Sequence, residues 1–95
     1  MERSNKSALN FPNVSRSYDA TRSRVRFWGY DRSIEILFFV EAAALRKLHP
    51  DMNDAEENVL RVFDAALERI HEAADKAYVR GRKGTHAYNL AVEDF

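Results

Sequence analysis

The sequence predicts an α+β fold: a small antiparallel sheet of three to four strands packed against a short and a long C-terminal helix, in the order β-β-β-α-α-β. Residues alternate in character along 24–30 and 33–40, which is typical of strands. The apolar residues then recur at helical spacing, and alternation returns over 86–93. With 95 residues, of which 45% are hydrophobic, the chain has the size of one domain. We expect a flexible tail over 1–7 and a single α+β domain over 8–95.

The N-terminal part predicts one edge of the sheet. Residues 8–11 are assigned to a short edge strand, because Pro12 cannot continue a regular ladder. The next segment, 13–23, is rich in Ser, Asn, Asp and Arg, a composition typical of loops. We expect an ordered loop there, anchored by Tyr18.

The two alternating segments predict a hairpin. In 24–30, the apolar side chains of Val25 and Phe27 alternate with large polar and aromatic residues, so the strand has two unlike faces. A turn follows and leads into 33–40, which is apolar on both faces near its end. This second strand is therefore expected to be central in the sheet and covered on both sides.

Two helices follow the hairpin. Strong helix formers fill 41–48, and Pro50 ends this short helix. Asn53 and Glu56 resemble a capping box, which predicts that the long helix over 54–80 begins directly after Asn53. At 1.5 Å per residue this helix would be about 40 Å long. A small domain is narrower than that, so part of the helix would kink, project or pack on a second copy of the chain.

Composition excludes several classes of protein. Fifteen basic and fifteen acidic residues leave no net charge, and the absence of cysteine excludes disulfides, thiolate zinc sites and a cysteine nucleophile. The longest apolar run, residues 36–40, is too short to cross a membrane. The first residues lack the apolar core of a signal peptide. We therefore expect a soluble, cytoplasmic protein that does not bind membranes.

The charges are unevenly distributed along the chain. Residues 1–32 hold seven Lys or Arg against three Asp or Glu, whereas residues 33–79 hold five against ten. Such asymmetry can indicate a basic surface for an anionic partner. Because the whole chain is neutral, we favour the alternative that the two halves of one fold attract each other.

The sequence contains few residues suited to catalysis. It lacks a phosphate-binding glycine motif, a G-x-S-x-G elbow and an H-E-x-x-H pair. Glu68 and His71 have the spacing of a di-iron ligand pair, but such sites need two pairs and further carboxylates. A solvated helix face with local ion pairs explains this spacing better. We expect no catalytic residue, no metal, no cofactor and no enzymatic activity.

One face of the first hairpin strand is a candidate binding surface. If Val25 and Phe27 point into the core, a basic and aromatic set faces the other way: Arg24, Arg26, Trp28 and Tyr30, extended by Arg16, Tyr18, Arg22 and Arg32. Guanidinium groups bind phosphates, and aromatic rings stack on unpaired bases. In the alternative, structural interpretation, which we favour, Trp28 packs under 13–23 and the arginines pair with nearby carboxylates.

A second basic cluster follows the long helix, at Arg80, Arg82 and Lys83. A loop of this kind can hold a nucleic-acid backbone. It is equally typical of a helix end, where cations compensate the helix dipole and glycine assists the turn. We favour the structural interpretation here too, so nucleic acid is an alternative partner rather than the preferred one.

Four stretches of the chain resemble a known family. They are Phe11-Pro-Asn-x-Ser-Arg-Ser-Tyr-Asp19, Val25-Arg-Phe-Trp-Gly-Tyr-Asp31, Phe38-Phe-Val40 with Ala44-Leu45, and Tyr78-x-Arg-Gly81. Together they resemble the bacterial domain of unknown function 1488 family, over nearly the whole chain. The resemblance implies a small cytoplasmic bacterial α+β protein without an assigned activity, so it transfers no functional residue.

These observations predict a non-enzymatic interaction or regulatory module. A homodimer through the long helix would cover its broad apolar stripe; alternatively, the sheet alone covers that stripe. The second functional hypothesis is a nucleic-acid-binding module that uses the two basic clusters.

Overall fold

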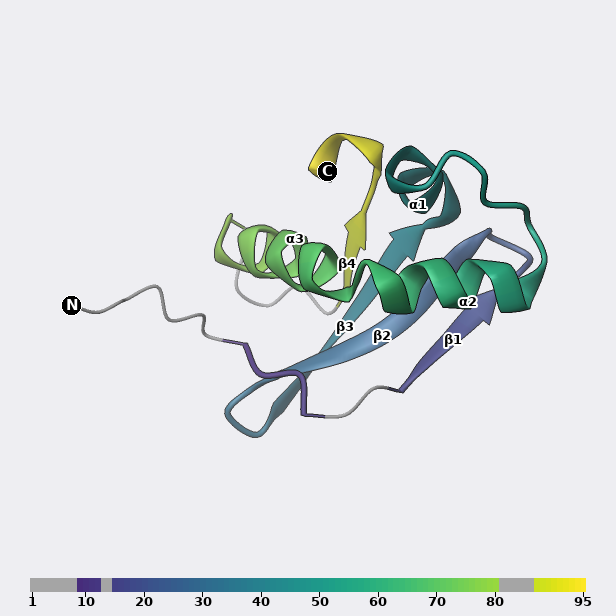
Figure 1. Ribbon diagram of the computed structural model, residues 1–95. Helices are drawn as coiled ribbons and strands as arrows, with labels where there is room; N and C mark the ends of the chain where they lie inside the picture. The colour runs from purple at the N-terminus through teal and green to yellow at the C-terminus, as the bar shows by residue number, and fades with distance from the viewer. Residues whose placement is uncertain (1–8, 13–14, 81–86) are drawn as a thin grey trace.

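The computed structural model describes residues 9–12, 15–80 and 87–95 of the chain (Figure 1). It confirms the α+β class and the predicted order of strands and helices, with the long helix divided in two. The predicted tail lies outside the described residues. The elements are β1 (Arg16–Asp19), β2 (Arg24–Asp31), β3 (Ile34–Glu41), α1 (Ala42–Leu48), α2 (Glu56–Ala65), α3 (Leu67–Arg80), β4 (Ala87–Leu90) and a short 3-10 helix (Val92–Asp94).

The four strands form one sheet in the order β1-β2-β3-β4, so β3 is central as predicted. The expected cover on both of its sides is wrong, because Leu37 and Phe39 on one face are partly exposed and no helix of the described residues lies over them. β1 and β3 pair with β2 in antiparallel fashion, but β4 pairs with β3 in parallel, from Leu37↔Ala87 to Val40↔Leu90. The sheet is therefore mixed rather than antiparallel. Parallel neighbours need a crossover connection, and the helical segment between β3 and β4 supplies it. The alternation over 86–93 could reveal a strand but not its direction.

The N-terminal edge differs from the prediction. Arg16–Asp19 was expected to be a loop but forms β1, with Tyr18 opposite Val25. Of the strand expected at 8–11, the described part contributes an isolated bridge, in which Asn10 and Tyr30 exchange two backbone hydrogen bonds of 2.8 Å. Pairing with β2 outweighs the loop-like composition, because strand preference depends strongly on neighbours.

The β2–β3 hairpin follows the predicted pattern. Its register runs from Arg24↔Glu41 to Asp31↔Ile34, one residue beyond the expected strand ends. The inward side chains are buried, whereas Ile34, predicted on the same face, is 62% exposed because it lies at the hairpin tip. The buried set comprises Val25, Phe27, Ile36, Phe38 and Val40.

The predicted helix over 54–80 is divided at Ala66, whose φ of −103° and ψ of 17° interrupt the helical backbone. Figure 1 shows α2 and α3 following each other across one face of the sheet. Their apolar residues Val59, Phe63 and Ile70 are buried, so the sheet covers the stripe. The bend at Ala66 keeps both α2 and α3 in contact with the twisted sheet. One end of a straight helix of the same length would extend beyond the sheet.

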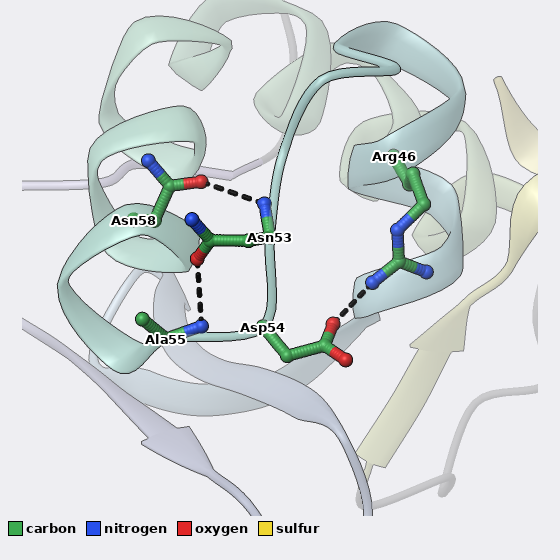
Figure 2. A network of polar contacts seen from close by, with 5 residues as sticks. All are labelled: Arg46, Asn53, Asp54, Ala55 and Asn58. Carbon is green, nitrogen blue, oxygen red and sulfur yellow. Dashed lines mark hydrogen bonds and ion pairs between the residues drawn. The ribbon is translucent and has the colours of Figure 1, made fainter.

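The start of α2 also differs from the predicted capping box. The helix begins at Glu56, and Asn53 Oδ1 accepts a 2.9 Å hydrogen bond from the backbone N–H of Ala55 (Figure 2). Asn58 reaches back from the helix, and its Oδ1 accepts from the Asn53 N–H at 2.9 Å. Arg46 of α1 pairs with Asp54. The asparagine side chains therefore replace the expected Glu56 contact.

No helix among the described residues is long and apolar enough to cross a membrane.

Gly29 allows the N-terminal segment to pack on the sheet. It lies on the helix-covered face of β2, and a Cβ atom added there would come within 2.7 Å of Cε1 of Phe11. The Phe11 ring lies 6.2 Å from the rings of both Phe27 and Phe38. A larger residue at position 29 would therefore displace Phe11 from the aromatic core.

We expect Gly29→Ala to lower the free energy of unfolding by about 1–3 kcal/mol, the usual cost of overpacking. Urea denaturation followed by circular dichroism measures this cost. In a Phe11→Ala background the same substitution should cost less than about 0.5 kcal/mol, because the obstructing ring is gone. An equal cost in both backgrounds would contradict the contact.

Candidate functional site

The sheet face opposite α2 and α3, here called the outer face, carries the residues predicted for binding. Direct partners of antiparallel strands share a face, so Arg26 lies beside Phe39, and Trp28 beside Leu37. The described elements place no helix over this face (Figure 1). Its members are Ser17, Asp19, Arg24, Arg26, Trp28, Tyr30, Glu35, Leu37, Phe39, Glu41, Ala87 and Asn89.

Arg24 packs against the outer face rather than projecting from it. Its guanidinium carbon lies 3.6 Å from the centroid of the Phe39 ring, a cation–π contact. Its Nε lies 3.7 Å from Oδ2 of Asp19, and among the described residues this buried Nε has no hydrogen-bond partner. Arg24 thus covers Phe39, a contact that the sequence did not predict. The structural interpretation paired the arginines with carboxylates, and of these contacts Arg24 makes the one with Asp19.

Arg26 is the exposed cation of this face, and its guanidinium carbon lies 5.5 Å from the Trp28 ring. Tyr30 is turned to Glu35, since its hydroxyl donates to Oε2 at 3.4 Å. Trp28 is partly exposed beside Arg26. We therefore take Arg26 and Trp28 as the candidate binding residues of the predicted cluster.

The outer face combines an apolar centre with charges of both signs. Trp28, Leu37 and Phe39 are all partly exposed. Around them lie two arginines and three carboxylates, from Asp19, Glu35 and Glu41. The Glu41 carboxylate accepts a 2.7 Å hydrogen bond from Asn89 of β4. A phosphate chain would meet these carboxylates as well as the arginines.

The residues predicted to extend this face lie elsewhere where the structure describes them. Arg16 and Tyr18 lie opposite Phe27 and Val25, on the helix-covered face. Arg22 and Arg32 are exposed in the turns that follow β1 and β2. The side chain of Arg80, together with Arg82 and Lys83, lies outside the described residues, so its convergence with the sheet stays a prediction.

A cavity of about 410 Å³ lies where the N-terminal segment and β1 meet the α2–α3 junction, and its lining includes Trp28 of β2 as well as residues of the helix-covered face. Arg16 and Asp64 line it and form a bidentate ion pair: Nε to Oδ1 at 2.9 Å and Nη2 to Oδ2 at 2.8 Å. The hydrogen bond to Asp64 raises the pKa of Arg16, which stays charged. No local pattern could have indicated this pair, because 48 residues separate its members.

His71 of α3 lines the same cavity and stacks on Phe11, with ring centroids 3.8 Å apart and planes 7° from parallel. Burial lowers the pKa of His71 below its ordinary value of 6.5, although the charge of Asp75 opposes this effect. His71 is therefore neutral at pH 7. Glu68, its predicted companion, is exposed, and the described residues contain no group of three or more side chains able to hold a metal.

Fold and site together define a small α+β protein whose described helices cover one face of the sheet, with a cavity of mixed lining beside β1. The family model described as a protein of unknown function (DUF1488) matches residues 9–90, and the chain belongs to this family. A solved protein of unknown function from the DUF1488 family of Shewanella loihica PV-4 is similar in fold, with a TM-score of 0.77 and 16% identity. The similarity covers 90% of this chain and 93% of that chain. No curated protein matches the chain.

We expect acid to weaken the fold through His71. Because its pKa is lower in the folded than in the unfolded chain, its stabilising contribution is complete above pH 6.5 and is lost as the pH falls from there through the folded pKa. His71→Phe keeps a ring against Phe11 but cannot titrate. Urea denaturation from pH 7.5 downwards should show a shallower loss of stability in this variant than in the wild type.

The matched control is His49→Gln, which removes a histidine that is exposed after α1 and does not line the cavity. An identical pH dependence in His71→Phe and the wild type would contradict the role of His71.

Proposed function

We propose that the protein is a non-enzymatic interaction module whose binding surface is the outer face, and that its partner is a second copy of the chain. The observation that supports this most directly is the apolar centre of Trp28, Leu37 and Phe39 on a sheet face without a helical layer. Sheets usually bury such side chains against another layer. A second outer face would supply that layer.

The charges around this centre favour a like partner. In a two-fold dimer the same patch meets itself, so a cation on one copy can face an anion on the other. The outer face offers both, with Arg26 exposed on β2 and Glu35 exposed on β3. A wholly basic patch would repel its own copy.

The long helix is the other surface considered for a homodimer. Its apolar stripe packs on the sheet, and the large apolar residue that remains exposed on α3 within the described part is Val79, at 75%. One valine is a smaller apolar surface than the centre of the outer face. We therefore place the proposed dimer contact on the sheet.

Nucleic acid is the second candidate partner, supported by the exposed Arg26 beside Trp28. Single-stranded nucleic acids bind surfaces that combine cations with aromatic rings. Against it, Arg24 is occupied by Phe39 and Asp19, and carboxylates share the face. The cytoplasmic location, the bacterial source and the absence of enzymatic activity likewise remain proposals. Substrate turnover that requires Asp64 or His71 would contradict the last of these.

Sedimentation equilibrium tests the dimer. We expect the wild-type mass to rise towards twice that of one chain with concentration, and Leu37→Glu to raise the dimer dissociation constant at least about tenfold, as for a residue central to an interface. Val79→Glu is the matched control, and we expect it to change the constant less than about twofold. If Val79→Glu alone abolishes assembly, the dimer forms through the helix instead.

Titration with single-stranded RNA and DNA at low and moderate salt separates the two partners. We expect no change in Trp28 fluorescence on adding oligonucleotide. The nucleic-acid alternative would be established if the protein is monomeric and oligonucleotide quenches its Trp28 emission, provided that salt restores the emission. In that case the emission of Arg26→Ala should not respond to oligonucleotide. A monomer that ignores oligonucleotides would refute both uses of the outer face.

A further inference from the structure

The cavity beside β1 lies near two pairings of β2 with the N-terminal part of the chain: Arg16 is opposite Phe27, and Asn10 is bridged to Tyr30. It is bounded on its other side by α2 and α3. Its volume, about 410 Å³, is within the usual range for small-molecule sites.

Aromatic rings form much of the lining. The rings of Phe27 and Phe63 meet edge to face with their centroids 5.4 Å apart, and the Phe11 ring is stacked on that of His71. Leu67 adds an aliphatic wall. Such walls favour a flat, unsaturated ligand, since aromatic rings pack on one another in stacked or edge-to-face arrangements.

The polar groups of the lining balance to zero charge. Arg16 contributes one positive charge, Asp64 one negative charge, and His71 is neutral at pH 7. The guanidinium has five N–H groups and binds Asp64 through its Nε and Nη2 edge, so its other edge still carries donors. The carboxylate likewise has more acceptor positions than the ion pair uses.

We propose that this cavity binds an uncharged, planar heteroaromatic molecule whose edge carries a hydrogen-bond donor next to an acceptor. The acceptor takes a hydrogen bond from Arg16, and the donor gives one to Asp64. Arg16 would attract an anion, but Asp64 would repel it. Asp64 would attract a cation, but Arg16 would repel it. The free energy lost by removing either ion from water would therefore not be recovered in the cavity. Aromatic carboxamides and nucleobase-like rings have the required edge.

Three probes of nearly equal shape test the charge preference: nicotinamide is neutral, nicotinate is an anion and benzamidine is a cation. We expect nicotinamide to shift the aromatic NMR signals of His71 and Phe11 in a saturable manner. A dissociation constant of about 0.1–10 mM suits so small a probe. Nicotinate and benzamidine should bind at least about fivefold more weakly.

Two variants change the charge of the lining in opposite directions. Asp64→Asn leaves the charge of Arg16 uncompensated, so we expect nicotinate to become the tightest of the three probes. Arg16→Gln leaves Asp64 uncompensated, so we expect benzamidine to become the tightest. Asp64→Asn decides alone if the other variant does not fold, since the Asp64 side chain is 52% exposed and its replacement keeps its shape.

Val79→Ala is the control, because Val79 is exposed on α3 and is not among the residues that line the cavity, so all three affinities should be unchanged. The dimer is tested separately by sedimentation, so either proposal can fail without the other. The proposal is overturned if no probe shifts His71 or Phe11 at about 10 mM, a limit for weak fragments. It is equally overturned if the three probes bind alike, or if Asp64→Asn leaves their order unchanged.

Discussion

The contact between Phe27 and Phe38 organises the rest of the fold. These residues face each other across β2 and β3, and their rings stack with centroids 5.3 Å apart. Two later elements meet this pair: Phe63 of α2 lies 5.4 Å from Phe27, and Tyr88 of β4 lies 5.5 Å from Phe38, between ring centroids. Phe11 reaches both rings across Gly29. Because one aromatic pair joins the N-terminal segment, a helix and the last strand, the loss of either ring would affect all three.

α2 and α3 bury this aromatic pair and therefore both pack on the same face of the sheet. Within the described part of the chain, no helix is left to cover the other face. The chain covers the outer face partly with its own charged side chains. The guanidinium of Arg24 packs on the Phe39 ring, so this charged side chain is partly buried although it belongs to the outer face. Trp28 and Leu37 receive less cover, so the apolar surface that remains is concentrated at the middle of β2 and β3. The proposed dimer contact is thus a consequence of where the helices pack.

The sequence predicts those features that depend on periodicity. The alternation of Val25 and Phe27 placed the two faces of β2 correctly. Helical spacing identified buried residues such as Phe63 and Ile70, but not Val62 or Ala73, which are buried as well. It could not predict the parallel pairing of β4, because alternation is the same in either direction. Nor could it place β1, because the composition of this segment is typical of loops and its strand conformation depends on pairing with β2. The cavity was missed for the same reason: Phe11, Arg16, Asp64 and His71 come from four separate parts of the chain.

The Arg16–Asp64 pair links the fold to the proposed ligand site. Its side chains are 31% and 52% exposed, and ion pairs of that kind contribute at most about 1 kcal/mol to stability. Its larger physical effect is on charge, because it keeps a guanidinium beside an aromatic lining without leaving the cavity positively charged. His71 acts in the same direction, since burial against Phe11 keeps it neutral at pH 7. As proposed, a lining built from a balanced ion pair, a neutral imidazole and phenyl rings would select by shape and hydrogen-bond pattern, whereas the outer face, with its exposed charges of both signs, would select by electrostatic complementarity.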